Sequence, residues 1–290
     1  MSRQKISPQF IGLLWMTGTA FCYATSYVVM GLLTHDMNIY VVTFLRCVIG
    51  CAFLGPWILM TRPRTIFVTR WNIYFVRSLA AYAAMLFTIY GVANVAVADI
   101  TALIMASPLF TVLFAAVFLR ERVGIHRWAA LLVAGAGALL IIRPGYTELT
   151  LASFAGLLAA FGYGIANVGT KALTDTDHPD AVAFWLYALV VPLSAVPAIY
   201  HWTIPALDTL PLLIFLGLLT MLSQYCMGRS FRIADTSVVL PAHYLQMPFA
   251  AGLAFLVLSQ VPSVWVWPGA LIIAASAYYT VAREGRQNRD

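Results

Sequence analysis

A short polar stretch interrupts one of the apolar segments of this chain, between Pro241 and Pro248. Each proline removes a backbone donor, so the carbonyl groups left without a partner must bind side chains, water or a ligand. The stretch therefore predicts a broken helix beside a cavity, with both prolines as helix-break or gating positions. Its imidazole, His243, titrates near neutral pH in water and is a candidate for substrate binding and proton coupling. Tyr244 and Gln246 are further binding candidates, and a histidine bonded to a neighbouring helix is the structural alternative.

Arg46 is the strongest candidate for direct contact with a charged substrate. It lies about two turns into an apolar segment, where an unpaired cation costs at least about 2.5–3.5 kcal/mol in a bilayer. Two interpretations stay open: a clamp for a substrate carboxylate, or a structural arginine that bonds carbonyl groups where helices meet. Arg77 is expected to extend its side chain to the cytoplasmic water interface.

Tyr82 and Tyr163 lie near the middle of their apolar segments and are candidates for lining a binding pocket. A tyrosine ring offers a flat stacking surface to a planar substrate and a hydroxyl for hydrogen bonding. Tyrosine and tryptophan also gather at both surfaces of a membrane. That belt is the alternative interpretation for aromatic residues near segment ends, such as Trp57 and Trp202.

The acidic residues lie near the ends of the apolar segments, and none lies in the middle of one. A passage without fixed negative charge is poorly suited to carrying cations by carboxylate exchange, so zwitterionic or anionic cargo is favoured. The eleven acidic residues are Asp36, Asp99, Glu121, Glu148, Asp175, Asp177, Asp180, Asp208, Asp235, Glu284 and Asp290.

Ten segments must position these residues, and each is long enough to span, or nearly span, a bilayer. The chain has 290 residues, of which 62% are hydrophobic and 10% charged, and so few charges do not cover a water-facing surface. Lipid offers no partner for a free backbone group, so the predicted fold is all-α, a polytopic membrane protein. The predicted spans are 10–33, 39–60, 72–93, 98–119, 127–142, 151–171, 181–200, 209–228, 236–258 and 264–282.

The basic residues predict how the spans are oriented. With alternating spans, the side that carries the N-terminus collects fourteen Lys and Arg residues, and the opposite side collects only Arg143. Because basic loops stay in the cytoplasm, both termini of this multi-pass chain are expected on the cytoplasmic side of a cell inner membrane. The same bias accounts for the net charge of +6. The expected partners are therefore membrane lipid and a small-molecule substrate, with no nucleic acid.

The two halves of the chain resemble each other at an offset of 140 residues. The matched pairs include Phe21 with Phe161, Tyr23 with Tyr163, Phe44 with Phe184 and Pro108 with Pro248. The predicted division is residues 1–145 and 146–290, with five spans in each repeat. Because five is odd, the second copy enters the membrane from the opposite side, which makes an inverted repeat. Transporters built this way bind substrate near the midplane, between the repeats.

These features resemble the drug/metabolite transporter superfamily, and within it the ten-span EamA type. The residues that carry the resemblance are Arg46 in the second span and, in the fourth, the alanine-rich start at 98–102, the mid-helix Pro108 and the closing Glu121. In the second copy Pro248 keeps the proline, whereas Gln260 replaces the glutamate. The resemblance covers essentially the whole chain and adds Pro108 as a helix-break or gating candidate.

Members of this superfamily are metabolite carriers, so the resemblance implies transport of a small organic molecule by alternating access. The chain looks most like bacterial amino-acid exporters of the YddG kind, and export of amino acids, aromatic ones among them, is the leading hypothesis. The alternative is another metabolite, such as a nucleotide-like or methylated cofactor. An embedded enzyme or scramblase is a remote alternative, because the sequence has no HExxH motif and no Gly-rich phosphate loop. Its five histidines lie in different segments, so neither a metal site nor a bound cofactor is predicted.

Overall fold

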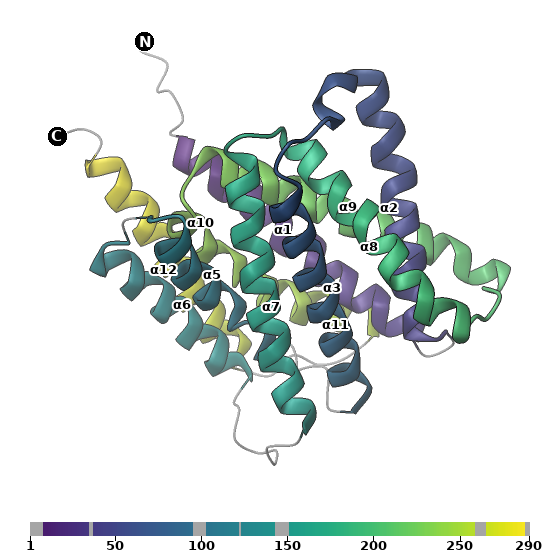
Figure 1. Cartoon of the computed structure of the whole chain (residues 1–290). Coiled ribbons are helices and arrows are strands. Elements are labelled where there is room, and N and C mark those ends of the chain that lie inside the picture. Colours follow the sequence, from purple (N-terminus) through teal and green to yellow (C-terminus); the bar gives the residue numbers. More distant parts are fainter. Residues whose placement is uncertain are drawn as a thin grey trace, which may run out of the picture.

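Helices make up all the regular structure in the described part of the chain. The computed structural model describes residues 8–34, 37–94, 103–121, 123–142, 151–258 and 265–287 (Figure 1). The all-α fold class is confirmed. The elements are α1 (Pro8–Thr34), α2 (Ile39–Thr61), the 3-10 helix η1 (Pro63–Ile66), α3 (Trp71–Asn94), α5 (Ser107–Phe118), α6 (Ile125–Ile142), α7 (Leu151–Thr174), α8 (Pro179–Tyr200), the 3-10 helix η2 (Leu207–Thr209), α9 (Leu210–Ile233), α10 (Thr236–His243), α11 (Gln246–Leu258) and α12 (Val266–Gln287).

The helices follow the predicted spans, with the ninth span divided into α10 and α11. The alanine-rich start of the fourth span, at 98–102, lies outside the described residues. Within the described residues, five helical stretches are long and apolar enough to cross a membrane by length and composition. Large apolar side chains such as Met60, Leu256 and Leu271 are exposed on the outside of the bundle. Apolar surface of this extent indicates that the outside of the bundle contacts lipid.

The most extensive helix packing joins helices of opposite halves. α3 packs along α7, and the equivalent pair in the repeat, α9 and α1, packs in the same way. The contact of α5 with α7 is likewise matched by that of α11 with α1. α2 packs on α8 and α6 on α12, so each of these helices contacts its own counterpart. This exchange of partners is consistent with two inverted repeats whose helices interleave in one bundle.

Two glycines allow helices of opposite halves to approach closely. A Cβ atom at Gly162 of α7 would lie 3.0 Å from the carbonyl oxygen of Ala80 on α3. A Cβ atom at Gly137 of α6 would lie 3.0 Å from the carbonyl oxygen of Gly269 on α12. Small residues at such crossings let backbones meet in lipid, where apolar burial gives little driving force.

The fourth and ninth spans have prolines at equivalent places. Pro108 lies in the first turn of α5 and Pro248 in the first turn of α11, where the missing N–H has no intrahelical acceptor. The structure puts Pro108, predicted as a mid-helix proline, after a turn at 105–106. The pyrrolidine ring clashes with the carbonyl four residues earlier, so the helix is interrupted there. Pro241 lies inside α10, two residues before that helix ends.

Candidate functional site

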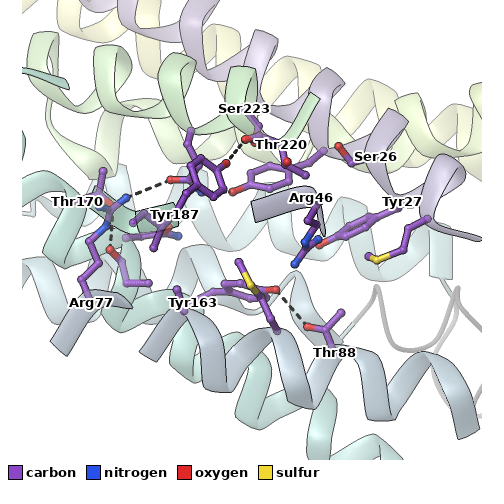
Figure 2. A pocket seen from close by; sticks show the side chains of 18 residues that line it. Ser26, Tyr27, Arg46, Arg77, Thr88, Tyr163, Thr170, Tyr187, Thr220 and Ser223 are labelled. Carbon is purple, nitrogen blue, oxygen red and sulfur yellow. Dashed lines mark hydrogen bonds between the residues drawn. The ribbon is translucent and has the colours of Figure 1, made fainter. Parts of the chain in front are cut away.

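A cavity lies at the centre of the bundle, and the space between its lining atoms, open solvent included, is about 750 Å³ (Figure 2). α1, α2 and α3 of the first half and α7, α8 and α9 of the second contribute its walls. The polar part of the lining consists mainly of tyrosines, hydroxyl side chains and two arginines.

Arg77 of α3 is one of these arginines and is held by the protein. Its guanidinium donates to the Thr170 hydroxyl at 2.8 Å and to the Val182 carbonyl at 2.7 Å. A third bond reaches the side-chain oxygen of Gln224 at 3.2 Å. One side chain thus joins α3 to α7, α8 and α9. The expectation that Arg77 extends to the water interface is wrong, because neutral acceptors satisfy its donors inside the bundle, where it is 1% exposed.

Arg46 of α2 lies in the same cavity with different surroundings. Its side chain points into the cavity (Figure 2) and is 8% exposed. It donates no hydrogen bond to an oxygen or nitrogen of the residues that the structure describes. A buried cation with no oxygen or nitrogen acceptor in the described chain is costly, so water or cargo must satisfy most of its donors. Of the two interpretations left open by the sequence, this geometry favours contact with cargo.

Tyrosines give the cavity flat surfaces. The lining tyrosines are Tyr23, Tyr27, Tyr163 and Tyr187. The rings of Tyr23 and Tyr27 are stacked with centroids 6.5 Å apart, and Tyr23 accepts a hydrogen bond from Gln224 Nε2 at 2.6 Å. The hydroxyls of Tyr163 and Thr88 lie 3.3 Å apart. Held in this way, the rings present stacking surfaces that need little reordering when a planar molecule binds.

A second, smaller cavity lies against the α10–α11 break. His243 and Gln246 line it from that break, and Ser107 lines it from the start of α5. Tyr23, Tyr27, Tyr163 and Asn167 line this cavity and the central one alike. The two cavities therefore adjoin, and Tyr23 and Tyr163, which are repeat equivalents, stand between them.

The charge of the site is positive. Along the described lining of both cavities there are two arginines and no carboxylate. Asp180, at the start of α8, pairs with Arg229 at 3.4 Å near the end of the bundle, outside both linings. In a low-dielectric interior, uncompensated arginines favour neutral or anionic molecules and disfavour cations.

Polar contacts tie the helix ends together on the side where α1 begins. The Tyr74 hydroxyl donates to Asp177 at 2.8 Å, which joins α3 to the loop before α8. Arg62 lies 2.9 Å from Nε2 of His178, the residue just before α8. Burial lowers the pKa of His178 below its usual value. The nearby carboxylate of Asp180 partly opposes this effect, and the guanidinium of Arg62 adds to it. The neutral imidazole is therefore the form that accepts the arginine bond.

A second contact on this side joins the fourth and ninth spans. Glu121 accepts a 2.7 Å hydrogen bond from the hydroxyl of Thr236, at the start of α10. Burial raises the pKa of Glu121, and the bond from Thr236 partly opposes that rise. The closing glutamate of the first repeat thus contacts the opposite repeat. Together with the Tyr74 and Arg62 contacts, it links the two halves across this end of the bundle.

Comparison with known families decides what kind of protein has this cavity. Residues 10–143 and residues 150–282 each match the EamA-like transporter family, a member of the drug/metabolite transporter superfamily. The chain belongs to the EamA-like transporter family. It is therefore a multi-pass membrane protein and a transporter rather than an enzyme.

Several curated relatives of this EamA-like transporter match most of its length. A riboflavin transporter of Rhizobium johnstonii is 29% identical over 96% of this chain and 93% of its own. The pseudopaline exporter CntI of Pseudomonas aeruginosa is 28% identical over 84% of this chain and 87% of its own. An S-adenosylmethionine uptake transporter of Rickettsia bellii is 22% identical over 94% of both chains. The amino-acid exporters suggested by the sequence are not among these relatives, so the comparisons do not support amino-acid export.

A solved crystal structure also matches the whole bundle. It superposes with a TM-score of 0.79 over 98% of this chain and 99% of its own, at 17% sequence identity. At this identity the likeness concerns the fold alone. It supports the arrangement of about ten helices in two halves.

The structure brings four of the six predicted binding residues of this EamA-like transporter to the cavities. Arg46 and Tyr163 line the central cavity, and His243 and Gln246 line the second, as does Tyr163. Tyr82 is half-buried and packs against a core shared by α2, α3, α7 and α8. Tyr244 lies in a hydrophobic core with residues of α1, α6, α9 and α12.

The places of Tyr23 and Tyr27 of α1 in the cavity wall, and the central position of Arg77, were not predicted from the sequence. A signal for α1 does exist, because Tyr23, Ser26 and Tyr27 follow the i, i+3, i+4 spacing of one helix face. In an otherwise apolar span, that polar stripe marks the side that faces the cavity. Nothing comparable identifies the role of Arg77, since its acceptors come from three separate helices.

Proposed function

We propose that this transporter moves a flat aromatic metabolite that is neutral or anionic, and that riboflavin is the first cargo to test. The observation that carries the proposal is the central cavity, which four tyrosines and two arginines line and to which no described carboxylate contributes (Figure 2). Riboflavin has a planar three-ring system, carbonyl acceptors and no positive charge. A relative of similar length is a riboflavin transporter, which supports this choice.

Each part of the lining has a role in the proposal. The rings of Tyr23, Tyr27 and Tyr163 stack on the planar part of the cargo. Arg46 donates to a carbonyl or an anionic group of the cargo, since its donors have no oxygen or nitrogen acceptor in the described chain. Arg77 keeps the wall in place through its bonds to the second half. Transport then proceeds by alternating access, in which the repeats move about a site near the midplane.

Amino-acid export is the second candidate and has less support. Arg46 would suit the carboxylate of an amino acid, but no described lining residue offers a carboxylate to the ammonium group. The same reasoning disfavours a methylated cofactor with a sulfonium cation, such as S-adenosylmethionine. A nucleotide-like or other heterocyclic cofactor fits the tyrosines and the positive charge better.

The orientation in the membrane is also proposed. Basic residues, among them Arg62, Arg70, Arg229 and Arg232, lie toward the end where α1 begins. The positive-inside rule therefore supports cytoplasmic termini in an inner membrane.

Proton coupling is proposed through His243. The described lining has no carboxylate to stabilise an imidazolium, which favours the neutral ring in this conformation. Coupling would therefore require a second, hydrated conformation in which the ring gains a proton. An imposed pH gradient across proteoliposomes tests this with wild type and His243→Leu. Equal accumulation of cargo by both proteins would remove His243 from the coupling mechanism.

A flux assay with a chemically chosen panel tests the cargo. Purified protein in liposomes is given riboflavin, tryptophan and S-adenosylmethionine, with protein-free liposomes as the control. We expect saturable flux of riboflavin, weaker flux of tryptophan and none of S-adenosylmethionine. Saturable flux of S-adenosylmethionine without flux of riboflavin would overturn the proposal, because the cavity would then accept a cation in spite of its arginines.

A further inference from the structure

Three polar side chains at the α10–α11 break have buried atoms without a hydrogen-bond partner among the described residues. They are both ring nitrogens of His243, the hydroxyl of Tyr244 and Nε2 of Gln246. All three side chains are at least 95% buried. Buried polar groups are nearly always paired in native proteins, so an unpaired group beside a cavity indicates a partner that arrives from outside the chain.

Only part of this group faces a cavity. His243 and Gln246 line the second cavity, which adjoins the central one through Tyr23 and Tyr163. The His243 ring packs edge-on against the ring of Tyr23, with centroids 5.9 Å apart. Tyr244 points elsewhere, since a Cβ at Gly135 of α6 would lie 3.3 Å from its hydroxyl. The unpaired atoms of two residues are therefore available to cargo, and that of the third is not.

We propose that the second cavity is a specificity subsite of the transport site, which takes the hydrogen-bonding edge of a heterocycle with adjacent carbonyl and N–H groups. This inference rests on the proposed function and adds which part of the cargo is recognised and by which residues. The central cavity holds the rest of the molecule, beside Arg46. The shared tyrosines span the junction between the two parts.

The chemistry of the unpaired atoms selects this class of edge. A neutral imidazole has one N–H donor and one lone-pair acceptor, whichever tautomer is present. The amide nitrogen of Gln246 adds a donor 3 positions along the chain. A ring N–H of the cargo donates to the His243 acceptor, and the neighbouring carbonyl accepts from Gln246 Nε2. Imides, such as the pyrimidine-dione edge of a flavin or a pteridine, have this arrangement.

Binding measurements with N-methylated pairs test the subsite. Wild-type protein in detergent is titrated by calorimetry with riboflavin, N3-methylriboflavin, lumazine and N3-methyllumazine. Methylation blocks the imide N–H and leaves the planar rings intact. We expect at least about tenfold weaker binding of each methylated compound, because His243 and Gln246 would remain buried without partners.

Two variants and one matched control identify the residues responsible. His243→Leu and Gln246→Met remove polar side-chain atoms and keep similar bulk. His243→Leu loses no hydrogen bond within the described chain, and Gln246→Met loses at most a contact with the Tyr27 hydroxyl, so both are expected to fold. Each should reduce the discrimination against the methylated compounds to about twofold or less. Tyr244→Phe removes an equally buried, unpaired hydroxyl outside the cavities and should keep the full discrimination.

The outcomes separate this inference from the proposed function. Riboflavin binding with no methyl discrimination, or discrimination that survives in both variants, overturns the subsite and leaves the flavin cargo standing. If lumazine binds more tightly than N3-methyllumazine only when His243 and Gln246 are present, and riboflavin does not bind, the subsite is supported and the flavin cargo is refuted. If wild type binds none of the four compounds, both are refuted.

Discussion

Replacing Arg46 by glutamine tests whether the two arginines of the central cavity have different roles, one in transport and one in stability. The Arg46 guanidinium has no oxygen or nitrogen acceptor among the described residues, so the substitution should cost the fold little. A hydrogen bond from a charged donor contributes about 1.5–3 kcal/mol. At about 1.4 kcal/mol per factor of ten, loss of such a bond to cargo lowers kcat/KM for transport roughly 10- to 150-fold.

Arg77→Gln is the matched control, since it removes the same charge from the same cavity. Arg77 makes three hydrogen bonds to helices of the second half. Their loss is partly offset by relief of a buried charge, which leaves a destabilisation of about 2–4 kcal/mol. Arg77→Gln should therefore lower the thermal unfolding midpoint in detergent by several degrees, whereas Arg46→Gln should leave it nearly unchanged.

Two assays on each variant decide the matter: riboflavin flux in proteoliposomes and the thermal unfolding midpoint of the purified protein. Expression level and monodispersity are measured beside them, so that a failure to fold is not mistaken for a failure to transport. If Arg46→Gln unfolds several degrees lower while Arg77→Gln does not, then Arg46 rather than Arg77 stabilises the fold, contrary to the roles given to them above. Arg46→Lys adds a further check, because it keeps the charge and should restore part of the flux.

The remaining predictions concern packing, pH and topology. A Cβ at Gly164 would lie 2.6 Å from Cβ of Phe110, so Gly164→Ala should destabilise the α5–α7 contact by about 1–3 kcal/mol. The control is Gly252→Ala, because a Cβ there would have no atom within 4 Å. The Gly164→Ala protein should have the lower thermal unfolding midpoint of the two. Burial raises the pKa of Glu121, so its contribution to stability is greatest below about pH 4.3 and is lost as pH rises through the folded-state pKa. The unfolding midpoint of Glu121→Gln should therefore depend less on pH between pH 4 and 7.5 than that of wild type. An unchanged pH dependence would contradict this. Reporter fusions at both termini should be active only with reporters that work in the cytoplasm, and periplasmic activity at either end would reverse the proposed orientation.

Much of the fold could be predicted from the sequence, because lipid leaves few alternatives. A segment of about twenty apolar residues has to be a helix, and the helices lie close to the predicted spans. The same reasoning located Arg46 and the polar stretch around His243, since polar groups at membrane depth are costly unless they are used. The resemblance to the EamA type was also correct, and the family match covers both halves.

Which side of each helix faces the cavity was harder to predict. In a soluble protein, apolar side chains mark the core, but in a membrane protein the lipid-facing side is apolar as well. Tyr82 and Tyr163 both lie near mid-span, yet of the two only Tyr163 lines the central or the second cavity. The cargo was hard to predict for a similar reason, because the composition indicates the charge of the binding site but not the shape of the cavity.

The sequence by itself determined the number of membrane segments, their approximate ends and the exclusion of acidic residues from their centres. These properties depend on local hydropathy, which each segment carries independently of its neighbours. Only the tertiary structure decided that Arg77 has acceptors on three helices while Arg46 has no oxygen or nitrogen acceptor among the described residues. It also decided that His243 and Gln246 meet in a cavity whose lining does not include Tyr244. Such differences depend on which helices of the opposite repeat supply hydrogen-bond acceptors at a given depth in the bundle. The packing that brings those helices together joins residues about a hundred or more positions apart in the sequence.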